Sequence, residues 1–456
     1  MLDIEKEQYI RNTLSKSDLK EFLDSFSDSK KIIISYSGGI DSSVLLHLLF
    51  SIRENLKQSL EVIHINHGLY EKSNDWERFC KKECASYNIP FTAISIHENC
   101  PKNVSVECWA RDKRYFLIGK EMSKDDVLLT AHHMDDQVET FFLQALRGAG
   151  PRGLSSMPVV KRFGDGFHAR PFLHIRRSEL ERYAKINNLL WQDDQSNSDI
   201  RYDRNYLRHR VLANVENSWP SYRQNISRVI SHQKESMNLL GEIALEDMKK
   251  VLCKNLINLD IKMLKKLSLP RQKNLIFYWL DNLNLEKPGS KHMSQIITTL
   301  INAGPDKSPC VNWKNTEVRK YRDHLYALET IKTHDENEEI YWNTNSPLEI
   351  QGEKLIAKET YGKGILKSCI NGAKITIRYR HGGEKIYLNS LSNSKTVKQL
   401  FQEYGVLPWL RDRVPLIYIN EELAVIPGFC IGKRFSASGN ERSLDIYWSG
   451  YNKVLQ

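Results

Sequence analysis

The sequence predicts an α/β fold in which the first half of the chain forms a doubly wound parallel sheet. Short, β-branched apolar runs such as "KIIISYS" (31–37) are typical of buried strands. Segments with helical periodicity, such as "SSVLLHLLFSIREN" (42–55), separate these runs. Because strand and helix alternate at the spacing of βαβ units, we expect a parallel sheet with helices on both faces.

Three further strand–helix pairs continue the pattern. Right-handed crossovers bring the carboxyl ends of parallel strands to one edge of the sheet, where ligands of open, Rossmann-like sheets bind. Every predicted strand ends in polar or turn-forming residues, which predicts a site at that edge. The strands are expected at 60–68, 91–98 and 126–133, and their helices at 73–88, 106–122 and 135–148.

The remainder of the chain predicts two smaller domains. Residues 147–215 are rich in loops and end in a basic, aromatic stretch, "RYDRNYLRHRVL". The pattern is helical from about Trp219 to 303, and after 346 short β-type runs surround one helix. We therefore expect a ligand-binding α/β domain over 1–218, a small helical domain over 219–330 and a small α+β domain over 346–456.

The composition is that of a globular protein with an excess of positive charge. The 456 residues are 41% hydrophobic and 27% charged, and the formal charge of +10 favours a polyanionic partner. The eight cysteines form no C-x-x-C pair, which is typical of reduced thiols in the cytosol. The start of the chain carries acids, and no apolar run is long enough to span a bilayer. We expect a cytoplasmic protein without a signal peptide.

A glycine turn, "SGGIDSS", directly follows the first strand. Two glycines permit a tight turn, and the free amides and dipole of the next helix favour a phosphate group. The lysine of a Walker loop is absent, and Asp41 would repel phosphate unless Mg²⁺ lies between them. The alternative is that Asp41 and Ser42 only cap the helix. The candidate nucleotide-binding residues are Ser37, Gly38, Gly39, Ile40, Asp41 and Ser42, with Asp41 also the candidate Mg²⁺ ligand.

This turn, placed after a buried strand, resembles the PP-loop of the N-type ATP pyrophosphatases. The resemblance implies that ATP is cleaved between its α and β phosphates and that a substrate is adenylated. A Walker lysine serves transfer of the terminal phosphoryl group, whereas here the loop is expected to hold the departing pyrophosphate.

A second cluster, "AHHMDDQVET", places three acids at the start of the helix after the fourth strand. Asp135 and Asp136 lie four and three residues before Glu139, so the carboxylates share roughly one helix face. They can hold Mg²⁺ or an ammonium group, although acids in a first turn are also ordinary partners of the helix dipole. The two histidines before them leave zinc as a less favoured alternative.

In "VECWARDKRY", the residues Glu107, Arg111, Arg114 and Tyr115 fall on one helical face. A guanidinium at this position would clamp phosphate or stabilise the charge of the adenylation step. The alternative is a solvated ion pair between Glu107 and Arg111, which lie four residues apart.

The order of the motifs resembles the tRNA(Ile)-lysidine synthetase family. The match is strong over 31–215 and resumes near the C-terminus, whereas the helical middle matches only in position and character. One departure is Cys108 with Trp109, where small or polar residues are usual; both are expected to face the core. The matching stretches are "SGGIDSS", "HINHGL", "ECWARDKRY", "AHHMDDQVETFFLQALRGAGPRGLSSM", "DDQSNSDIRYDRNYLRHRVL", "YRHGGEKI" and "KQLFQEYGVLPWLRDRVPLIYINEELAVIPG".

The resemblance implies a ligation that uses ATP and Mg²⁺ on CAU-anticodon tRNA(Ile) and free L-lysine. ATP adenylates the ring carbonyl oxygen of the wobble cytidine, and the ε-amine of lysine then expels AMP. The lysidine product changes codon specificity from AUG to AUA and identity from methionine to isoleucine. The attacking amine must lose a proton, and one of the three acids is expected to accept it. The catalytic candidates are Asp41, Arg111, Asp135 and Glu139, and Asp136, His133 and Arg114 are candidates for substrate binding.

Basic and aromatic residues interleave in three stretches, as expected of an RNA-binding protein. Residues 371–456 contain 12 Lys and Arg against 7 Asp and Glu, so this segment carries a net +5, half of the excess of the chain. Solvated charged faces are the alternative. The expected tRNA contacts are Arg204 and Arg208 in "RYDRNYLRHR" and Arg378 and Arg380 in "TIRYRHGGEK", with "WLRDR" as the third stretch.

Three other functions are disfavoured. A tRNA thiolation enzyme usually needs paired thiols, and the chain has no C-x-x-C. A glutamine-dependent enzyme needs an ammonia source, and no separate glutaminase domain is evident. A non-catalytic RNA-binding module would not need Asp41 and the three acids of the second cluster. No obligate protein partner is inferred.

Overall fold

The chain forms two compact units, residues 1–239 and 240–456. Their structure, a computed structural model, describes residues 14–68, 73–102, 104–193, 199–252, 258–304, 309–331, 335, 337–388 and 394–451. The boundaries expected from the sequence, 1–218, 219–330 and 346–456, stay predictions.

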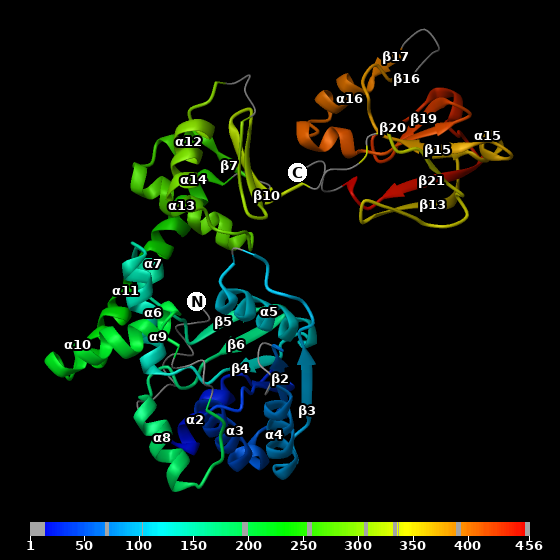
Figure 1. The fold of residues 1–456 in the computed structure, drawn as a ribbon. Coiled ribbons are helices and arrows are strands. Elements are labelled where there is room, and N and C mark those ends of the chain that lie inside the picture. Colours follow the sequence, from blue (N-terminus) through cyan, green and yellow to red (C-terminus); the bar gives the residue numbers. More distant parts are fainter. Residues whose placement is uncertain are drawn as a thin grey trace. The chain divides into compact units, whose positions relative to one another are not determined.

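Within the described residues, a six-stranded sheet of order β3-β2-β1-β4-β6-β5 forms the centre of the first unit (Figure 1). β1 pairs in parallel with β2 on one side and with β4 on the other. β3 and β6 continue the parallel arrangement, whereas β5 runs antiparallel. The predicted doubly wound parallel sheet is confirmed. The strands are β1 (Lys31–Ser35), β2 (Ser59–Asn66), β3 (Phe91–Ser95), β4 (Val127–Leu129), β5 (Val160–Phe163) and β6 (Gly166–Ala169).

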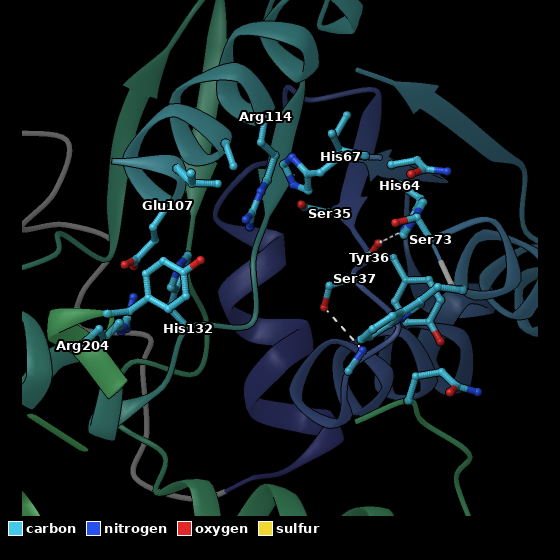
Figure 2. A pocket seen from close by; sticks show the side chains of 18 of the residues that line it. Ser35, Tyr36, Ser37, His64, His67, Ser73, Glu107, Arg114, His132 and Arg204 are labelled. Atoms are coloured by element: carbon cyan, nitrogen blue, oxygen red, sulfur yellow. Dashed lines mark hydrogen bonds between the residues drawn. The ribbon is translucent and has the colours of Figure 1, made fainter. Parts of the chain in front are cut away.

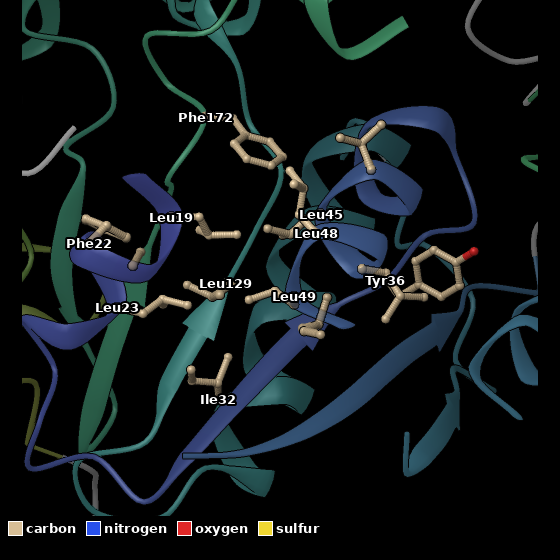
Figure 3. Close-up of a cluster of buried hydrophobic side chains, with 14 of the residues drawn as sticks. Leu19, Phe22, Leu23, Ile32, Tyr36, Leu45, Leu48, Leu49, Leu129 and Phe172 are labelled. Carbon is tan, nitrogen blue, oxygen red and sulfur yellow. The ribbon is translucent and has the colours of Figure 1, made fainter. Parts of the chain in front are cut away.

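Helices cover both faces of this sheet, with α3 and α4 on one side and α5 on the other (Figure 1). Side chains alternate along β1, so Ile32 and Ile34 pack in one core with Leu45 and Leu48 of α3 (Figure 3). Ile33 belongs to a second core, which includes residues of α5. This burial from both sides explains the unbroken apolar run of β1. The helices are α2 (Lys16–Asp24), α3 (Ile40–Ile52), η1 (Arg53–Asn55), α4 (Ser73–Ser86), α5 (Val106–Glu121), α6 (Met134–Leu146), α7 (Pro151–Leu154) and α8 (Arg177–Ile186).

The hairpin of β5 and β6 lies in a region that was expected to contain loops. Phe163 pairs with Gly166, so a two-residue turn at Gly164 and Asp165 joins the strands, with Gly164 at φ +56°. Two-residue turns that contain glycine are a hairpin signal, and "FGDG" carries it. The signal is weak here because each strand has four residues.

The basic stretch near residue 203 forms a helical segment beside α6. It comprises α9 (Asp203–Tyr206), a π-helical turn η3 (Leu207–Leu212) and α10 (Ala213–Ser218), and α11 (Tyr222–Val251) follows. Leu207, Leu212 and Tyr222 pack with Val138 of α6 in a small core. This packing holds the basic segment against the helix that carries the acidic cluster.

The second unit begins with a helical region that also contains a sheet. Among the described residues, β7, β10, β9 and β8 form an antiparallel sheet that the sequence did not predict. Both of its hairpins turn through two residues, with Lys314 at φ +46° and Arg322 at φ +53°. Neither turn contains the glycine that is typical of two-residue hairpin turns. The elements are β7 (Leu259–Asp260), α12 (Ile261–Lys265), α13 (Leu269–Asn282), α14 (Ser290–Gln295), η4 (Ile296–Leu300), β8 (Cys310–Trp313), β9 (Thr316–Tyr321) and β10 (His324–Glu329).

The C-terminal region has the α+β character predicted for it. Its described residues form sheets of order β11-β15-β18-β19-β20 and β12-β13-β21-β14, together with the hairpin β16-β17. Leu400 and Phe401 of α16 belong to the same core as Ile377 and Leu416 of the first sheet. The elements are β11 (Ile340–Tyr341), β12 (Leu348–Ile350), β13 (Glu353–Tyr361), β14 (Ile365–Leu366), α15 (Lys367–Ile370), β15 (Ile375–Arg378), β16 (Lys385–Tyr387), β17 (Ser394–Thr396), α16 (Val397–Glu403), η5 (Pro408–Arg413), β18 (Leu416–Ile419), β19 (Glu422–Ile426), β20 (Cys430–Ile431), η6 (Lys433–Phe435) and β21 (Arg442–Trp448).

No helix among the described residues combines enough length with enough apolar character to cross a bilayer.

Candidate active site

The glycine turn leads from β1 into α3. Gly38 has φ +79°, and a Cβ at this position would lie 2.5 Å from Trp76 Nε1 and 2.8 Å from Cys80 Sγ. The turn therefore requires glycine both for its backbone angle and for space. Gly39 is the N-cap of α3 and has no side chain with which to cap the helix. The amides of the first turn keep their hydrogen-bonding capacity for an anion.

Two serines hold the turn in shape. The Ser42 hydroxyl donates to the carbonyl of Gly39 at 2.9 Å and lies 3.1 Å from Ser37 Oγ. The backbone N–H of Gln192, from the loop after α8, donates to the carbonyl of Gly38 at 2.9 Å. Ser42 thus fastens the loop and does not cap the helix, which was the alternative interpretation.

Asp41 lies in the first turn of α3 and has one unsatisfied oxygen. Its Oδ1 is buried without a hydrogen-bond partner among the described residues, and its Oδ2 lies 3.6 Å from His133 Nε2. A buried carboxylate oxygen without a partner is costly unless a cation or donor meets it. In the part of the chain that is described, no three His, Cys, Asp or Glu side chains form a metal-binding group. Asp41 therefore fits Mg²⁺ that takes its other ligands from phosphate and water.

His133 connects Asp41 to the acidic helix α6. As the N-cap of α6, it donates its backbone N–H to Asp136 Oδ2 at 3.0 Å, and its Nδ1 lies 3.4 Å from the backbone N of Asp136. Burial disfavours charge on the imidazole, but Asp136, followed by Asp41 and Asp135, outweighs burial and raises the pKa of His133 to about 9. The 3.4 Å contact is weak, so the carboxylates decide its protonation. At neutral pH the positively charged His133 therefore lies between Asp41 of the glycine turn and the carboxylates of α6.

Two arginines of the basic segment bind the carboxylates of α6. Arg204 donates through Nε to Glu139 Oε2 at 2.6 Å and through Nη2 to Asp136 Oδ1 at 2.7 Å. Arg208 donates to both oxygens of Glu139, at 2.6 and 3.1 Å. Burial alone would raise the pKa of Asp136, but the charges of His133 and Arg204 hold it well below its usual range. We call this set of contacts the arginine clamp.

Asp135 has partners of its own. Arg223 of α11 donates to its Oδ1 at 2.6 Å, and the backbone N–H of Arg177 donates to its Oδ2 at 3.0 Å. Burial opposes ionisation, yet these two hydrogen bonds lower the pKa of Asp135. Both oxygens of Asp135 are thus engaged within the first unit.

A cavity of about 480 Å³ opens beside the loop, at the carboxyl ends of the strands. In Figure 2, Glu107, His132 and Arg204 gather on one side of it, and Tyr36 and Ser37 lie on the other. Burial lowers the pKa of His67 to about 4, so this wall residue is uncharged at neutral pH. The site residues predicted from the sequence that line the cavity are Ser37, Gly39, Arg114, Asp136, Arg204 and Arg208.

Arg114 of α5 lines the cavity without a carboxylate partner among the described residues. Burial, with the nearby charges of Arg111 and Arg204, lowers its pKa. An arginine in this position is well suited to an anionic ligand. Arg111 is exposed and does not line the cavity, although the sequence placed it in the site. Cys108 was expected to face the core but is exposed, with its Sγ 3.8 Å from Asp112 Oδ2; on the same helix Trp109 is buried as expected.

Arg378 and Arg380, predicted to contact RNA, lie in the second unit and are ion-paired there. Arg378 bonds to Glu421 and, at 3.2 Å, to Glu339, while Arg380 donates to Asp412 at 2.9 Å. Neighbouring acids thus balance the charge of both arginines.

Of the polar groups at the end of β2, the sequence placed Asn66 and His67 at the ligand edge but did not single out His64, which also lines the cavity. His64 donates from Nδ1 to the carbonyl of Tyr36 at 2.9 Å, and Asn66 donates to Glu77 Oε2 at 2.8 Å. Both residues come from the end of β2, where "HIN" places two polar side chains on one face of the strand. That alternation within a buried strand was the available signal.

Replacing Gly38 by alanine is expected to destabilise the unit and to weaken ATP binding. The backbone angle costs about 1 kcal/mol and the clash about 2 kcal/mol more. Gly148→Ala is the matched control, because Gly148 has φ +71° but nothing within 4 Å of its Cβ position. Denaturant unfolding and ATP calorimetry measure both effects. Equal losses in the two variants would show that the contact with Trp76 and Cys80 is unimportant.

The fold and the loop together define a class, the PP-loop proteins, whose domain model matches residues 11–215. Models described as the TilS substrate binding domain and the TilS substrate C-terminal domain match 259–326 and 375–448. The chain is 37% identical over 425 residues to the tRNA(Ile)-lysidine synthase of Coxiella burnetii, covering 93% of this chain and 94% of that one. The same enzyme of Legionella pneumophila (strain Paris) is 38% identical over 420 residues, 89% and 93% of the two chains. The chain belongs to the tRNA(Ile)-lysidine synthase family, as its motifs predicted.

Proposed function

We propose that this protein is the C–N ligase that joins lysine to the wobble cytidine of CAU-anticodon tRNA(Ile), with ATP as the energy source. The reaction changes codon specificity from AUG to AUA and amino-acid identity from methionine to isoleucine. The observation that carries the proposal is the family match over more than nine-tenths of the chain, joined to an open phosphate loop beside a cavity.

The first step is adenylation of the cytidine. The open end of α3 and Ser37 receive the β and γ phosphates, which depart as pyrophosphate. Arg114, free of carboxylates in the described chain, faces the nucleotide and offsets negative charge that develops at the α phosphate. The anticodon base must leave its stack to enter a cavity of this size, as in other single-stranded RNA readers.

Asp41 is proposed to hold Mg²⁺ in this step. Its buried Oδ1 supplies one anionic ligand, and the cation would neutralise part of the charge on the phosphates. His133, kept charged by its carboxylate neighbours, holds Asp41 in place through Oδ2.

The second step needs lysine beside the adenylated base. Asp136 lines the cavity and its low pKa keeps it charged, so it holds an ammonium group of lysine well and is a poor proton acceptor. Asp135 and Glu139 bind three arginines between them and, unlike Asp136, do not line the cavity, so we assign them to positioning, a different role from the catalytic one expected from the sequence.

A direct assay tests the function. Purified protein is mixed with ATP, Mg²⁺, labelled lysine and a CAU-anticodon tRNA(Ile) transcript, and label in the RNA is counted. Incorporation that depends on ATP, with release of AMP and pyrophosphate, is the expected result. A transcript with a different wobble base serves as the control. Folded protein that incorporates no lysine would overturn the proposal.

We also propose that the basic C-terminal surface binds the tRNA. Arg378→Ala is expected to weaken tRNA binding by about tenfold at low salt and to reduce the salt slope by about one, since one phosphate contact is lost. Filter binding measures both, and ATP affinity should not change. Arg162→Ala, an exposed arginine of the first unit, is the control. Unchanged tRNA affinity for Arg378→Ala would show that Glu339 and Glu421 keep this arginine from RNA.

A further inference from the structure

A chain of buried polar groups runs through the wall of the cavity to His132. Thr130 Oγ1 lies 2.7 Å from His132 Nδ1 and 2.8 Å from His168 Nε2. Arg170 Nη2 lies 3.1 Å from His168 Nδ1, and Arg170 also donates to the carbonyl of Pro158 at 2.7 Å. Thr130, His168 and Arg170 are 6%, 0% and 3% exposed, so water does not compete for these hydrogen bonds.

The donor and acceptor of each hydrogen bond in this series follow from Arg170, at which the series begins. Arginine only donates, so His168 Nδ1 accepts and the proton of the neutral ring lies on Nε2. That N–H donates to Thr130 Oγ1, and since His132 Nδ1 is the one other partner of this hydroxyl among the described residues, the threonine proton is donated to it. His132 then accepts at Nδ1 and carries its proton on Nε2.

His132 lines the cavity, and its Nε2, which this assignment protonates, makes no hydrogen bond within the described residues. Burial, with the positive charges of Arg170, Arg204 and Arg111, lowers the pKa of His132 to about 3 against the opposing effect of Asp136. The group that a ligand would meet is thus a neutral N–H donor, in a wall that also holds the Arg204 guanidinium and the carboxylates of Asp136 and Glu107. A ligand atom that bonds to this N–H must accept a hydrogen bond, as a phosphate oxygen does.

We propose that His132 is a catalytic residue that donates a hydrogen bond from Nε2 to a phosphate oxygen of the nucleotide. Thr130, His168 and Arg170 are positioning residues that set its tautomer. The proposal rests on the proposed function for the identity of the ligand. A donor whose proton position is set before the ligand arrives needs no reorganisation during the reaction, which is the property that makes such groups effective in catalysis.

The tautomer itself is the first test and requires no substrate. In protein labelled with ¹⁵N in its histidines, two-bond correlation spectra distinguish a ring protonated on Nε2 from one protonated on Nδ1. His132 is identified from the signal missing in His132→Gln. The wild-type ring should be neutral and protonated on Nε2 at pH 7, and Thr130→Val should give a mixture of tautomers. A wild-type ring protonated on Nδ1, or on both nitrogens, would overturn the proposal.

Single-turnover pyrophosphate release with CAU-anticodon transcript is the second test. His132→Leu should lower the rate about 100-fold, the effect of losing one preset donor, whereas His132→Gln, whose amide N–H replaces Nε2–H, should stay within about tenfold of wild type. Thr130→Val should lower the rate about tenfold with little change in the KM for ATP. Thr376→Val, at another buried threonine in the second unit, is the matched control and should match wild type.

The outcomes separate this proposal from the proposed function. If wild-type protein incorporates lysine but the leucine and glutamine variants of His132 react equally fast, the donor role fails and the function stands. If wild-type protein releases no pyrophosphate, the function fails, and the tautomer spectra still decide whether the buried chain sets the proton on His132. Circular dichroism of each variant shows that rate losses do not come from unfolding.

Discussion

Replacing Glu139 by glutamine is expected to lower the free energy of unfolding by about 3 kcal/mol, as when one partner of a buried ion pair is removed. Glu139 is 1% exposed and accepts three hydrogen bonds from Arg204 and Arg208. A glutamine has one acceptor oxygen and turns its NH₂ toward a guanidinium. Both arginines would then be left partly unpaired in a poorly solvated place, and the packing of the basic segment against α6 would loosen.

Denaturant unfolding of the full chain measures this loss. Glu403→Gln is the matched control, because Glu403 pairs with Lys395 at 2.7 Å on the surface and should cost less than about 1 kcal/mol. Lysine incorporation is measured in parallel. If Glu139→Gln keeps its stability but loses activity, Glu139 acts on the substrate as the sequence suggested. If it loses neither, the clamp has no importance for the fold or the reaction.

Asp41→Asn is expected to reduce lysine incorporation about 1,000-fold, equivalent to about 4 kcal/mol of transition-state stabilisation. The asparagine keeps the shape of the side chain but removes the negative charge that the proposed Mg²⁺ requires. It also removes one of the three carboxylates that keep His133 charged, so the cation between the loop and α6 is weakened. Both effects act on the phosphates at the start of α3.

The magnesium dependence of ATP binding tests this reasoning independently of turnover. Calorimetry should show that wild-type protein loses ATP affinity when EDTA removes Mg²⁺, whereas Asp41→Asn binds ATP weakly in both conditions. Asp24→Asn, an exposed aspartate that pairs with Lys20 at 2.6 Å, is the control and should behave as wild type. Asp41→Asn protein that retains the magnesium effect would assign the cation to other ligands.

The parts of the fold that the sequence predicted well are those with strong periodicity. The four strand–helix pairs of the first unit were evident because apolar runs and helical faces alternate at a regular spacing. The sheet formed by β8, β9 and β10 was missed because its turns use Lys314 and Arg322 at positive φ in place of glycine. The pairing of the three strands stabilises these turns, and this pairing cannot be recognised from the local sequence pattern.

The candidate site was predictable only where neighbours in space are also neighbours in sequence. The loop and the acids of α6 each lie within ten residues and carry their own motifs. The partners of those acids come from about 65 residues later, and the same arginines fit an RNA-binding pattern equally well. The hydrogen-bonded series from Arg170 to His132 joins residues at the ends of β6 and β4. It can be recognised only once the pairing of these two strands is known.

The arginine clamp also affects how the protein responds to ionic strength. Dissolved salt screens exposed charges over about 8 Å at physiological concentration, but it screens buried pairs such as Arg204 with Glu139 much less. Contacts between surface arginines and the phosphates of RNA weaken steeply with salt. Concentrated salt should therefore release the tRNA while the acids of α6 stay in place, and the enzyme recovers its site as soon as the salt is diluted.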